Sequence, residues 1–363
     1  MGLFTRKIET AAFASAPVKA AAGAANIGNF LYYNTGTDEL KALSCATVSR
    51  SRDLLAGLIG SLELKHYQKV WNSIDEEYNE VYLPLDPWME RPDPKVSRSF
   101  FFVNIFSDLF FYGIAYAYIT RRYAPSGGQT VGYPAAFTWL PAANMSSTQQ
   151  TGIPQFFGPS DELEFNGQPL DVNNVIQFVS PIEGVLKTGA RVINTSIYLD
   201  QAADRYAQLE TVPGYLQQIS GEDLSGEDLS SLASKWANAR KQNAIGALSS
   251  QVEFREYKQN PQDVIADQRK YQALELARLC NIPAYLVSAP TEGASMTYQN
   301  AQQARQDLYL FGARIYLDCI EQTLSADSVL PRGRYVEFNM EDYMSEVAQD
   351  TPSSNNEMST VND

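Results

Sequence analysis

The sequence predicts an α+β fold, and three stretches of the chain carry that prediction. Residues 279–324 read as the end of a helix, a strand-like hydrophobic step, a loop of small residues and then one long helix. Residues 212–259 have the order strand, helix, strand, with a helical pattern on each side. Residues 40–194 alternate helical periods with short hydrophobic strands. Helices and strands in this mixed order favour an α+β protein over an all-helical or all-β one.

The composition is that of an ordered but acidic protein. The chain has 363 residues, of which 44% are hydrophobic and 12% aromatic, which is enough for a large core and too much for wholesale disorder. Its formal net charge is −14. An acidic protein does not hold DNA through the release of counterions, as a basic protein does. Either the protein has no nucleic-acid partner, or it lets a polyanion pass without holding it, and charge alone favours the first interpretation.

The cysteines indicate a reducing compartment. Cys45, Cys280 and Cys319 are odd in number and far apart, and their spacing matches no disulfide framework or zinc site. Two of them fall on predicted helices, where a free cysteine is usually a small buried hydrophobic residue. We therefore expect buried thiols.

One segment imitates a membrane span. Residues 99–120 are dense in Phe and Tyr, but Asn104, Ser107 and Asp108 recur at helical spacing and form a polar stripe. Gly113 then ends the helical period, and a strand-like run follows. An amphipathic helix followed by a buried strand explains this segment better than lipid does, so we expect no membrane partner.

The first half of the chain begins with an Ala-rich arm, residues 1–39. We expect this arm to be flexible, and it lacks the hydrophobic block of a secretory signal. Apolar residues recur at helical intervals from 39 to 64, and residues 65–85 then read as strands around an acidic turn. Short strands and turns follow from 123 to 181.

The second half contains the two helices that flank the strand–helix–strand segment. The first is predicted at 195–211, where a Pro-Gly pair follows, and the second at 260–281, where an Asn-Pro pair opens it. Between them, Ser225 and Asp228 have the spacing of a capping box at the start of the middle helix. The chain ends with a strand at 335–338 and an acidic tail at 344–363, which we expect to be disordered.

No motif for catalysis, cofactor binding or metal binding stands out. His66 is the only histidine, although histidine supplies most general-base and zinc-ligand chemistry. It lies in a mixed strand edge, where a structural role is favoured. No Gly-Lys-Ser or Gly-Lys-Thr occurs, so the chain has no Walker A loop. Clustered carboxylates at 75–77 are typical of a solvated loop, although a pair of carboxylates working as in a glycosidase stays open.

Four stretches, taken in their order along the chain, resemble the portal protein family of tailed double-stranded DNA bacteriophages. They are similar to an early helix, a helix-to-strand block with a Gly-x-Ala-Tyr core, a Pro-containing step after a helix, and the opening of a long helix. These stretches are residues 48–62, 108–119, 279–287 and 295–301.

This resemblance implies a portal-like subunit. An α/β wing would comprise residues 40–194 and a return segment within 282–343. The paired stem helices would be 195–211 and 260–281, and a small α/β clip module, 212–259, would join them. The 282–343 segment would also hold a tunnel loop and the long tunnel helix that starts at residue 296, and the crown would be minimal or missing.

The resemblance also implies a function. Portal proteins form dodecameric rings at one capsid vertex of the virion, and double-stranded DNA passes through the ring during packaging and ejection without sequence specificity. The implied partners are further copies of the chain, this DNA, the terminase large subunit, the capsid protein and a head–tail adaptor. Before assembly the protein would lie in the host cytoplasm. No enzymatic activity and no cofactor are implied, and the negative charge becomes an advantage because an acidic channel does not trap phosphates.

Two sets of residues are candidates for functional contacts. Small residues in the tunnel loop would let its backbone approach and shift around DNA; this set is Ser288, Ala289, Pro290, Thr291, Glu292, Gly293, Ala294 and Ser295. On the clip helix, contact with a partner would involve Lys235, Trp236, Arg240 and Lys241. Plainer explanations stay open: Glu292 as an ordinary solvated carboxylate, and the cations as complements of the helix dipole.

Two other kinds of function also stay open. Another head–tail adaptor or shell component of a phage would self-assemble but would lack two helices joined by a small module. A soluble enzyme that uses carboxylates alone would be a monomer to a tetramer rather than a large ring. The native mass and the presence of a central hole separate these possibilities.

Overall fold

The computed structural model confirms the α+β class. Helices and strands alternate along the described part of the chain. The expected arm, except Glu39, and almost all of the expected tail lie outside the described residues. These are 39–73, 76–125, 130–147, 158–207, 214–220, 225–241, 252–256, 261–287 and 301–345.

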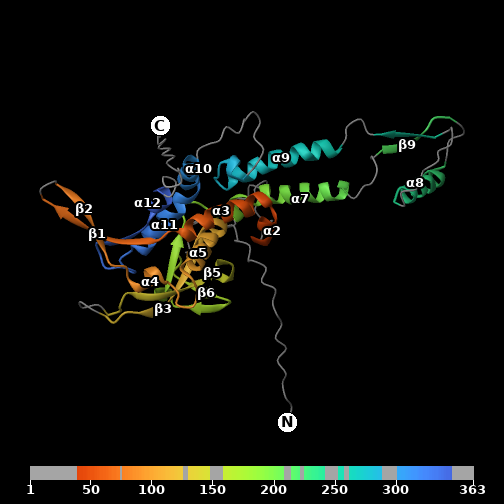
Figure 1. The fold of residues 1–363 in the computed structure, drawn as a ribbon. Coiled ribbons are helices and arrows are strands. Elements are labelled where there is room, and N and C mark those ends of the chain that lie inside the picture. Colours follow the sequence, from red (N-terminus) through yellow and green to blue (C-terminus); the bar gives the residue numbers. More distant parts are fainter. Residues whose placement is uncertain are drawn as a thin grey trace, which may run out of the picture.

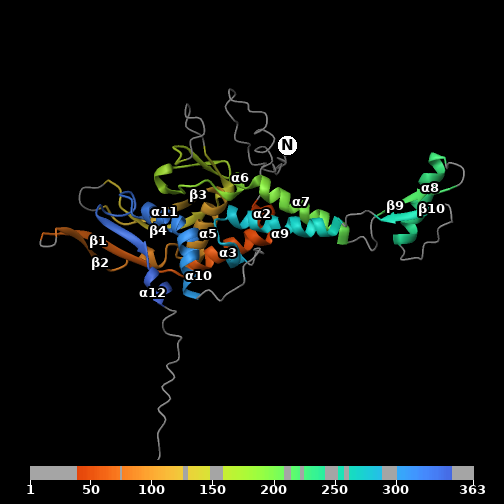
Figure 2. The same ribbon diagram turned by 90° about the horizontal axis from the view of Figure 1, so that it is seen from above.

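The main body packs short and long helices against small antiparallel sheets (Figures 1 and 2). Its first helices include two that cover residues 39–61 of the predicted 39–64 helix and one in the Phe-rich segment. They are α2 (Glu39–Ser44), α3 (Ala46–Ser61), α4 (Pro87–Glu90), α5 (Arg98–Tyr112) and α6 (Val185–Thr188), with 3-10 turns η1 (Ala142–Asn144) and η2 (Val172–Asn174).

Three small antiparallel sheets complete the body. The first, in the order β11-β1-β2, contains β1 (Leu64–Asn72), β2 (Glu77–Leu83) and β11 (Arg334–Phe338). The second, in the order β4-β3-β8, contains β3 (Ile114–Arg122), β4 (Pro134–Leu140) and β8 (Val175–Val179). The third contains β5 (Met145–Ser147), β6 (Leu163–Phe165) and β7 (Gln168–Leu170). The strands predicted at 65–85 and 335–338 are thus neighbours in one sheet.

Local chemistry defines both ends of α5, the central helix of the body. The Ser97 hydroxyl accepts a hydrogen bond from the Phe100 amide at 3.1 Å, which caps the N-terminus. At the other end Gly113 has φ +77°, and its amide donates to the Leu109 carbonyl at 2.9 Å. Only glycine adopts this left-handed conformation without strain, so the predicted change from helix to strand at Gly113 is confirmed.

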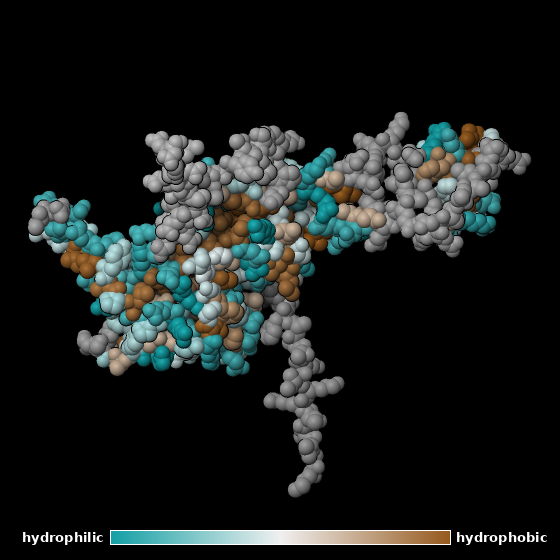
Figure 3. Space-filling view, viewed as in Figure 1, coloured by the Kyte–Doolittle hydropathy of each residue, from teal (hydrophilic) through white to brown (hydrophobic). Residues whose placement is uncertain are grey.

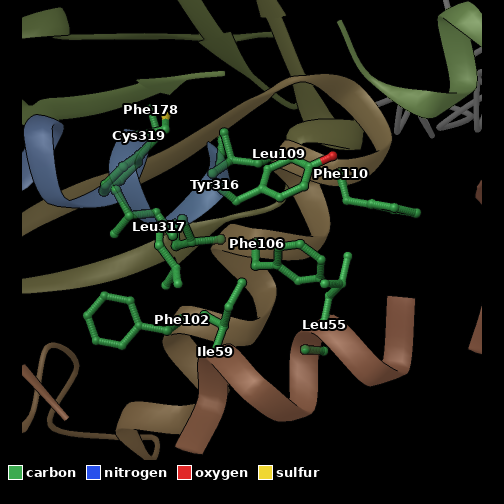
Figure 4. Close-up of a cluster of buried hydrophobic side chains, with 14 of the residues drawn as sticks. Leu55, Ile59, Phe102, Phe106, Leu109, Phe110, Phe178, Tyr316, Leu317 and Cys319 are labelled. Carbon is green, nitrogen blue, oxygen red and sulfur yellow. The ribbon is translucent and has the colours of Figure 1, made fainter. Parts of the chain in front are cut away.

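The core lies where α5 crosses α3 and the C-terminal helix α11 (Arg314–Leu324) (Figure 4). The Phe106 and Tyr316 rings meet edge to face, with 5.2 Å between their centroids. Leu55 and Ile59 of α3 are fully buried and point into the same cluster. Burying side chains of this size stabilises a fold by about 1.5–3 kcal/mol each.

The prediction that α5 is amphipathic, with its polar stripe facing solvent, is wrong. Asp108 is only 5% exposed, and Ser107 is buried as well. The Asp108 carboxylate accepts hydrogen bonds from the Trp139 indole at 2.8 Å and from the Ala142 amide at 3.0 Å. The helix is therefore buried on nearly all sides, and its carboxylate joins it to the β4–η1 connection.

Helices α7 (Ala190–Ala207) and α9 (Pro261–Leu279) lie side by side in both views (Figures 1 and 2). Helix α7 begins five residues before the predicted start at 195, and the structure describes it as far as Ala207. Helix α9 agrees closely with the helix predicted at 260–281. An added Cβ at Gly189 would lie 2.2 Å from a Leu279 methyl group, so the start of α7 contacts the end of α9 where only glycine fits.

The end of α9 is fixed by Asn281, as the sequence predicts. Asn281 has φ +54°, its amide donates to Arg278, and the Ile282 amide donates to Ala277, the two bonds of a Schellman motif. The hydrophobic step that follows is not a strand, which corrects the prediction. It is a 3-10 turn, η3 (Ala284–Val287), whose Leu286 amide donates to the Pro283 carbonyl.

The predicted long helix is not one regular α-helix within the described residues. It comprises α10 (Ala301–Asp307), the π-helical segment η4 (Leu308–Ala313) and α11, followed further on by α12 (Met340–Ser345). Gly312, the only glycine in this run, contacts α3, because an added Cβ would lie 2.7 Å from a Leu55 methyl group. The helical period from 301 to 324 is thus correct, but the regular geometry is not.

A small module lies beyond the outer ends of α7 and α9 (Figures 1 and 2). It contains β9 (Gly214–Gln218), α8 (Gly226–Lys241) and β10 (Val252–Glu256), and we call these three elements the distal module. The two strands pair antiparallel, with Leu216 opposite Phe254. The capping box is confirmed, because the Ser225 hydroxyl accepts from the Asp228 amide at 3.3 Å and donates to its carboxylate at 2.6 Å.

Candidate functional site

The candidate site comprises the α7–α9 pair, the segment on either side of residues 288–300, and the distal module. Two polar contacts set the alignment of the helix pair. The Gln272 amide donates to the Val192 carbonyl at 2.7 Å, and Arg269 forms a 2.9 Å ion pair with Asp200. As the position on α7 rises from 192 to 200, the position on α9 falls, so the helices are antiparallel.

The cations of α9 are all matched by carboxylates. Besides the pair between Arg269 and Asp200, Lys270 lies 3.1 Å from Asp267, and Arg278 pairs with Glu275. These pairs are largely exposed, so each contributes little to stability. A cation that already faces a carboxylate is also a weak partner for phosphate.

The chain on either side of residues 288–300 is held together at its base. The Tyr285 hydroxyl of η3 donates to the Asp307 carboxylate of α10 at 2.7 Å. Asn281 contributes a second link, because its side-chain amide donates to the Phe311 carbonyl of η4. Burial first, and then the hydrogen bond and charge of Asp307, raise the pKa of Tyr285 to about 12, so this hydroxyl keeps its proton at any physiological pH.

The candidate tunnel loop itself lies outside the described residues. That applies to Ser288, Ala289, Pro290, Thr291, Glu292, Gly293, Ala294 and Ser295. The described structure therefore gives the base of this loop, from Tyr285 and Asp307, and its role in contact with DNA stays a prediction.

The candidate contact residues of the distal module are divided between its surface and its interior. Lys235 is exposed. The Trp236 ring is half-buried and lies 5.8 Å from the ring of Phe254 on β10, so it holds the helix on the strand pair. Arg240 and Lys241 occupy the last turn of α8, and their side chains lie outside what is described.

The described residues contain little that suggests a catalytic site, a metal site or a membrane span. His66 is 2% exposed, and its Nδ1 lies 2.9 Å from the Pro84 carbonyl oxygen, which is a structural role. Among the described side chains no group of three or more His, Cys, Asp and Glu is placed to hold a metal ion. The described helices also include none that is both long enough and apolar enough to cross a bilayer.

The sequence analysis did not identify two carboxylates with raised pKa values, the buried Asp108 and the half-buried Glu321. Burial raises the pKa of Asp108 to about 7, although its bonds to Trp139 and Ala142 oppose that shift. Burial likewise raises the pKa of Glu321 on α11 to about 7, and there the opposing bond comes from the Phe338 amide of β11 at 2.8 Å. Nothing in the helical period marks these positions, because the donors come from distant elements.

The fold defines a structural class, because it is similar to solved chains from phage and phage-like particles. It matches the crystal structure of an HK97 family phage portal protein from Corynebacterium diphtheriae with a TM-score of 0.65 and 21% identity, over 88% of this chain and 99% of that one. It also matches a chain from the neck of a native gene transfer agent particle, computed with C12 symmetry, with a TM-score of 0.54 and 14% identity, over 89% and 92% of the two chains. At these identities the likeness establishes the fold alone.

The family itself is established by the sequence. The model of the phage portal proteins matches residues 46–358, which is most of the chain, so the chain belongs to the phage portal protein family. No protein of curated function matches the sequence significantly. The resemblance first noted in four short stretches is therefore confirmed at the level of the family, and this family is structural rather than enzymatic.

Proposed function

We propose that this chain forms a dodecameric ring at one vertex of a phage capsid and that double-stranded DNA enters and leaves through it. Membership of the portal family is the observation that carries the proposal. The C12 symmetry of the neck particle to which the fold is similar supports the subunit number. Helices α7 and α9 would be the stem, the distal module the clip, and residues 288–295 the tunnel loop.

The electrostatics support a conduit rather than a DNA-binding surface. A net charge of −14 and the pairing of each α9 cation with a carboxylate leave little to hold phosphates. A portal has to release DNA at every step of translocation. Weak contact with the duplex is therefore what this function requires.

The remaining partners follow from the position of the ring. The outer part of the body would contact the capsid protein. The distal module, with Lys235 on its surface, would contact the terminase large subunit during packaging and a head–tail adaptor afterwards. The protein would occupy the host cytoplasm before assembly and the virion after it.

Imaging and native mass test the ring directly. The protein is expressed together with its capsid protein, and the shells are examined by cryo-electron microscopy, with native mass measured on the free protein. We expect one ring with a central hole per shell and a free particle many-fold heavier than the 40.3 kDa chain. Shells with no ring, together with a free protein no larger than a tetramer, would contradict the proposal and favour the soluble-enzyme alternative.

A deletion tests the division of labour within the ring. Removing Ser288–Ser295 leaves the Tyr285–Asp307 link in place, so we expect rings to form while DNA packaging or retention falls. Substitution of the same eight residues by a Gly/Ser segment of equal length is the matched control for length. Loss of the rings after the deletion would show that this segment builds the assembly rather than acting on DNA.

A further inference from the structure

The outer half of the β1–β2 hairpin lacks support from the rest of its sheet. Strand β11 pairs with β1 only from Leu64 to Gln68, whereas β2 continues to pair with β1 out to Asn72. The hairpin projects from the end of the body opposite the distal module (Figures 1 and 2). Strand β2 is the edge of this sheet in the described structure. A two-stranded ribbon alone is marginally stable in water, and a free strand edge is a template for a further strand.

Large apolar side chains are exposed on this ribbon. On one face Trp71 is 53% exposed, Tyr78 64% and Tyr82 55%, and the Trp71 and Tyr78 rings meet with 5.0 Å between centroids. On the other face Val70 and Val81 are 44% and 43% exposed. Figure 3 shows hydrophobic residues at the surface over this hairpin. Exposed aromatic groups concentrated in this way mark an interaction surface.

A carboxylate that forms no ion pair with the described residues lies between the two exposed tyrosines. Glu80 shares the face of Tyr78 and Tyr82, because side chains alternate along a strand. Lys69 is opposite Glu80 in the register, but its ammonium group lies over the rings of Tyr67 and Tyr335, at 5.9 and 5.4 Å from their centroids. Glu80 forms no ion pair with another described residue. The edge of β2 therefore presents aromatic, anion, aromatic at alternate positions.

The geometry points to an added strand at this edge, formed by residues 3–8 of the arm of the same chain. Their sequence is Leu-Phe-Thr-Arg-Lys-Ile, so Phe4, Arg6 and Ile8 fall on one face of a strand. This order, apolar, cation, apolar, complements that of β2, with Arg6 opposite Glu80. The match is symmetrical about Arg6, so it holds for a parallel or an antiparallel strand.

The charge and the length of the arm support this occupant. Residues 1–37 carry Arg6, Lys7 and Lys19 against one carboxylate, Glu9, in a chain whose net charge is −14. The 30 residues from 9 to 38 span up to about 100 Å when extended, at about 3.3 Å per residue. A tether of this length raises the local concentration of the segment at its own β2 well above that of any free peptide.

A disulfide trap tests the register directly. Full-length R6C/E80C is treated with a mild oxidant and compared with R6C/E77C, whose second cysteine lies on the same strand but on its other face. The native cysteines, Cys45, Cys280 and Cys319, are buried and stay in place. We expect R6C/E80C to cross-link at least ten-fold faster than the control, and within one chain on a non-reducing gel.

Each other outcome overturns the assignment. Equal rates in the two variants would show that Arg6 has no preferred position at β2. Covalent dimers in place of an internal loop would assign the strand to a neighbouring chain. If neither variant cross-links, residues 3–8 do not lie at the hairpin.

A charge exchange supplies a second readout that needs no new covalent bond. In the full chain we expect E80R to increase amide hydrogen exchange of residues 77–83 by about ten-fold, and R6E/E80R to restore the protection. K19E, which removes an arm charge outside the proposed strand, should leave exchange unchanged. Equal exchange in wild type and E80R, or no recovery in the double variant, would contradict the pairing.

Discussion

The body and the distal module differ in what holds them together. Phe102, Phe106 and Phe110 of the body are each at most 1% exposed, and their rings contact further aromatic rings. In the described part of β9, α8 and β10 no side chain is buried to that degree, and the Trp236–Phe254 contact is made by half-buried rings. The body therefore carries the stability of the chain. The module keeps its shape with few buried contacts, so we expect it to open locally at a lower free energy than the body.

The largest expected effect comes from opening the core of the body. We expect Phe106→Ala to lower the free energy of unfolding by about 3–5 kcal/mol, because it leaves a cavity beside Tyr316. Denaturant unfolding followed by circular dichroism measures the change.

Phe100 on the same helix is the matched control. It is 47% exposed, and we expect Phe100→Ala to cost less than about 1 kcal/mol. If both substitutions lowered the free energy of unfolding equally, the buried face of α5 would contribute no more to stability than its exposed face.

We expect an effect of intermediate size from pH, because the stability of the body should depend on two carboxyl groups with raised pKa values. Asp108 and Glu321 have pKa values raised to about 7 by burial, against about 4 in an unfolded chain. Between pH 4 and pH 7 the folded state therefore holds more protons than the unfolded one, so stability falls as pH rises through this window and is constant above it. The expected loss is of the order of 1–4 kcal/mol per group.

Thermal unfolding at pH 5 and pH 8 measures this loss, and amide variants identify its source. We expect Asp108→Asn and Glu321→Gln each to reduce the difference between the two pH values, and the double variant nearly to abolish it. A double variant as sensitive to pH as the wild type would show that other groups dominate the titration.

The smallest expected effect on global stability comes from the distal module. We expect Leu232→Ala combined with Trp236→Ala to loosen residues 212–259, because the contact of α8 with Phe254 is lost. Limited proteolysis should then cut within this range faster, while the melting temperature of the body changes by less than about 2 °C. Unchanged proteolysis, or a large drop in the melting temperature, would show that the distal module and the body do not unfold independently.

The features that the sequence predicts well depend on nearby residues. The cap at Ser225, the end of α5 at Gly113 and the end of α9 at Asn281 each follow from bonds within a few residues. Strand and helix periods located the hairpin, α5 and β11 for the same reason. These signals also supported the family resemblance, which depends on the order of such elements.

The features that the sequence missed depend on distant residues. Asp108 takes its donors from positions 31 and 34 residues further along the chain, so its burial is invisible in the period of α5. The early start of α7 lies beside Gly189, whose close neighbour Leu279 is distant along the chain. The 3-10 turn at Ala284–Val287 and the π-helical segment both lie where the chain packs against α3, an element far away in sequence. For the tunnel loop, only the base is described.

Gly312 has a consequence for the surface next to it. Helix α3 lies so close at this position that any side chain would collide with Leu55, and this contact fixes the rotation of the π-helical segment about its own axis. With that rotation fixed, the two preceding residues point outward, where Leu310 is 51% and Phe311 53% exposed. A residue with no side chain of its own thus decides which apolar groups this helix presents at the surface of the subunit.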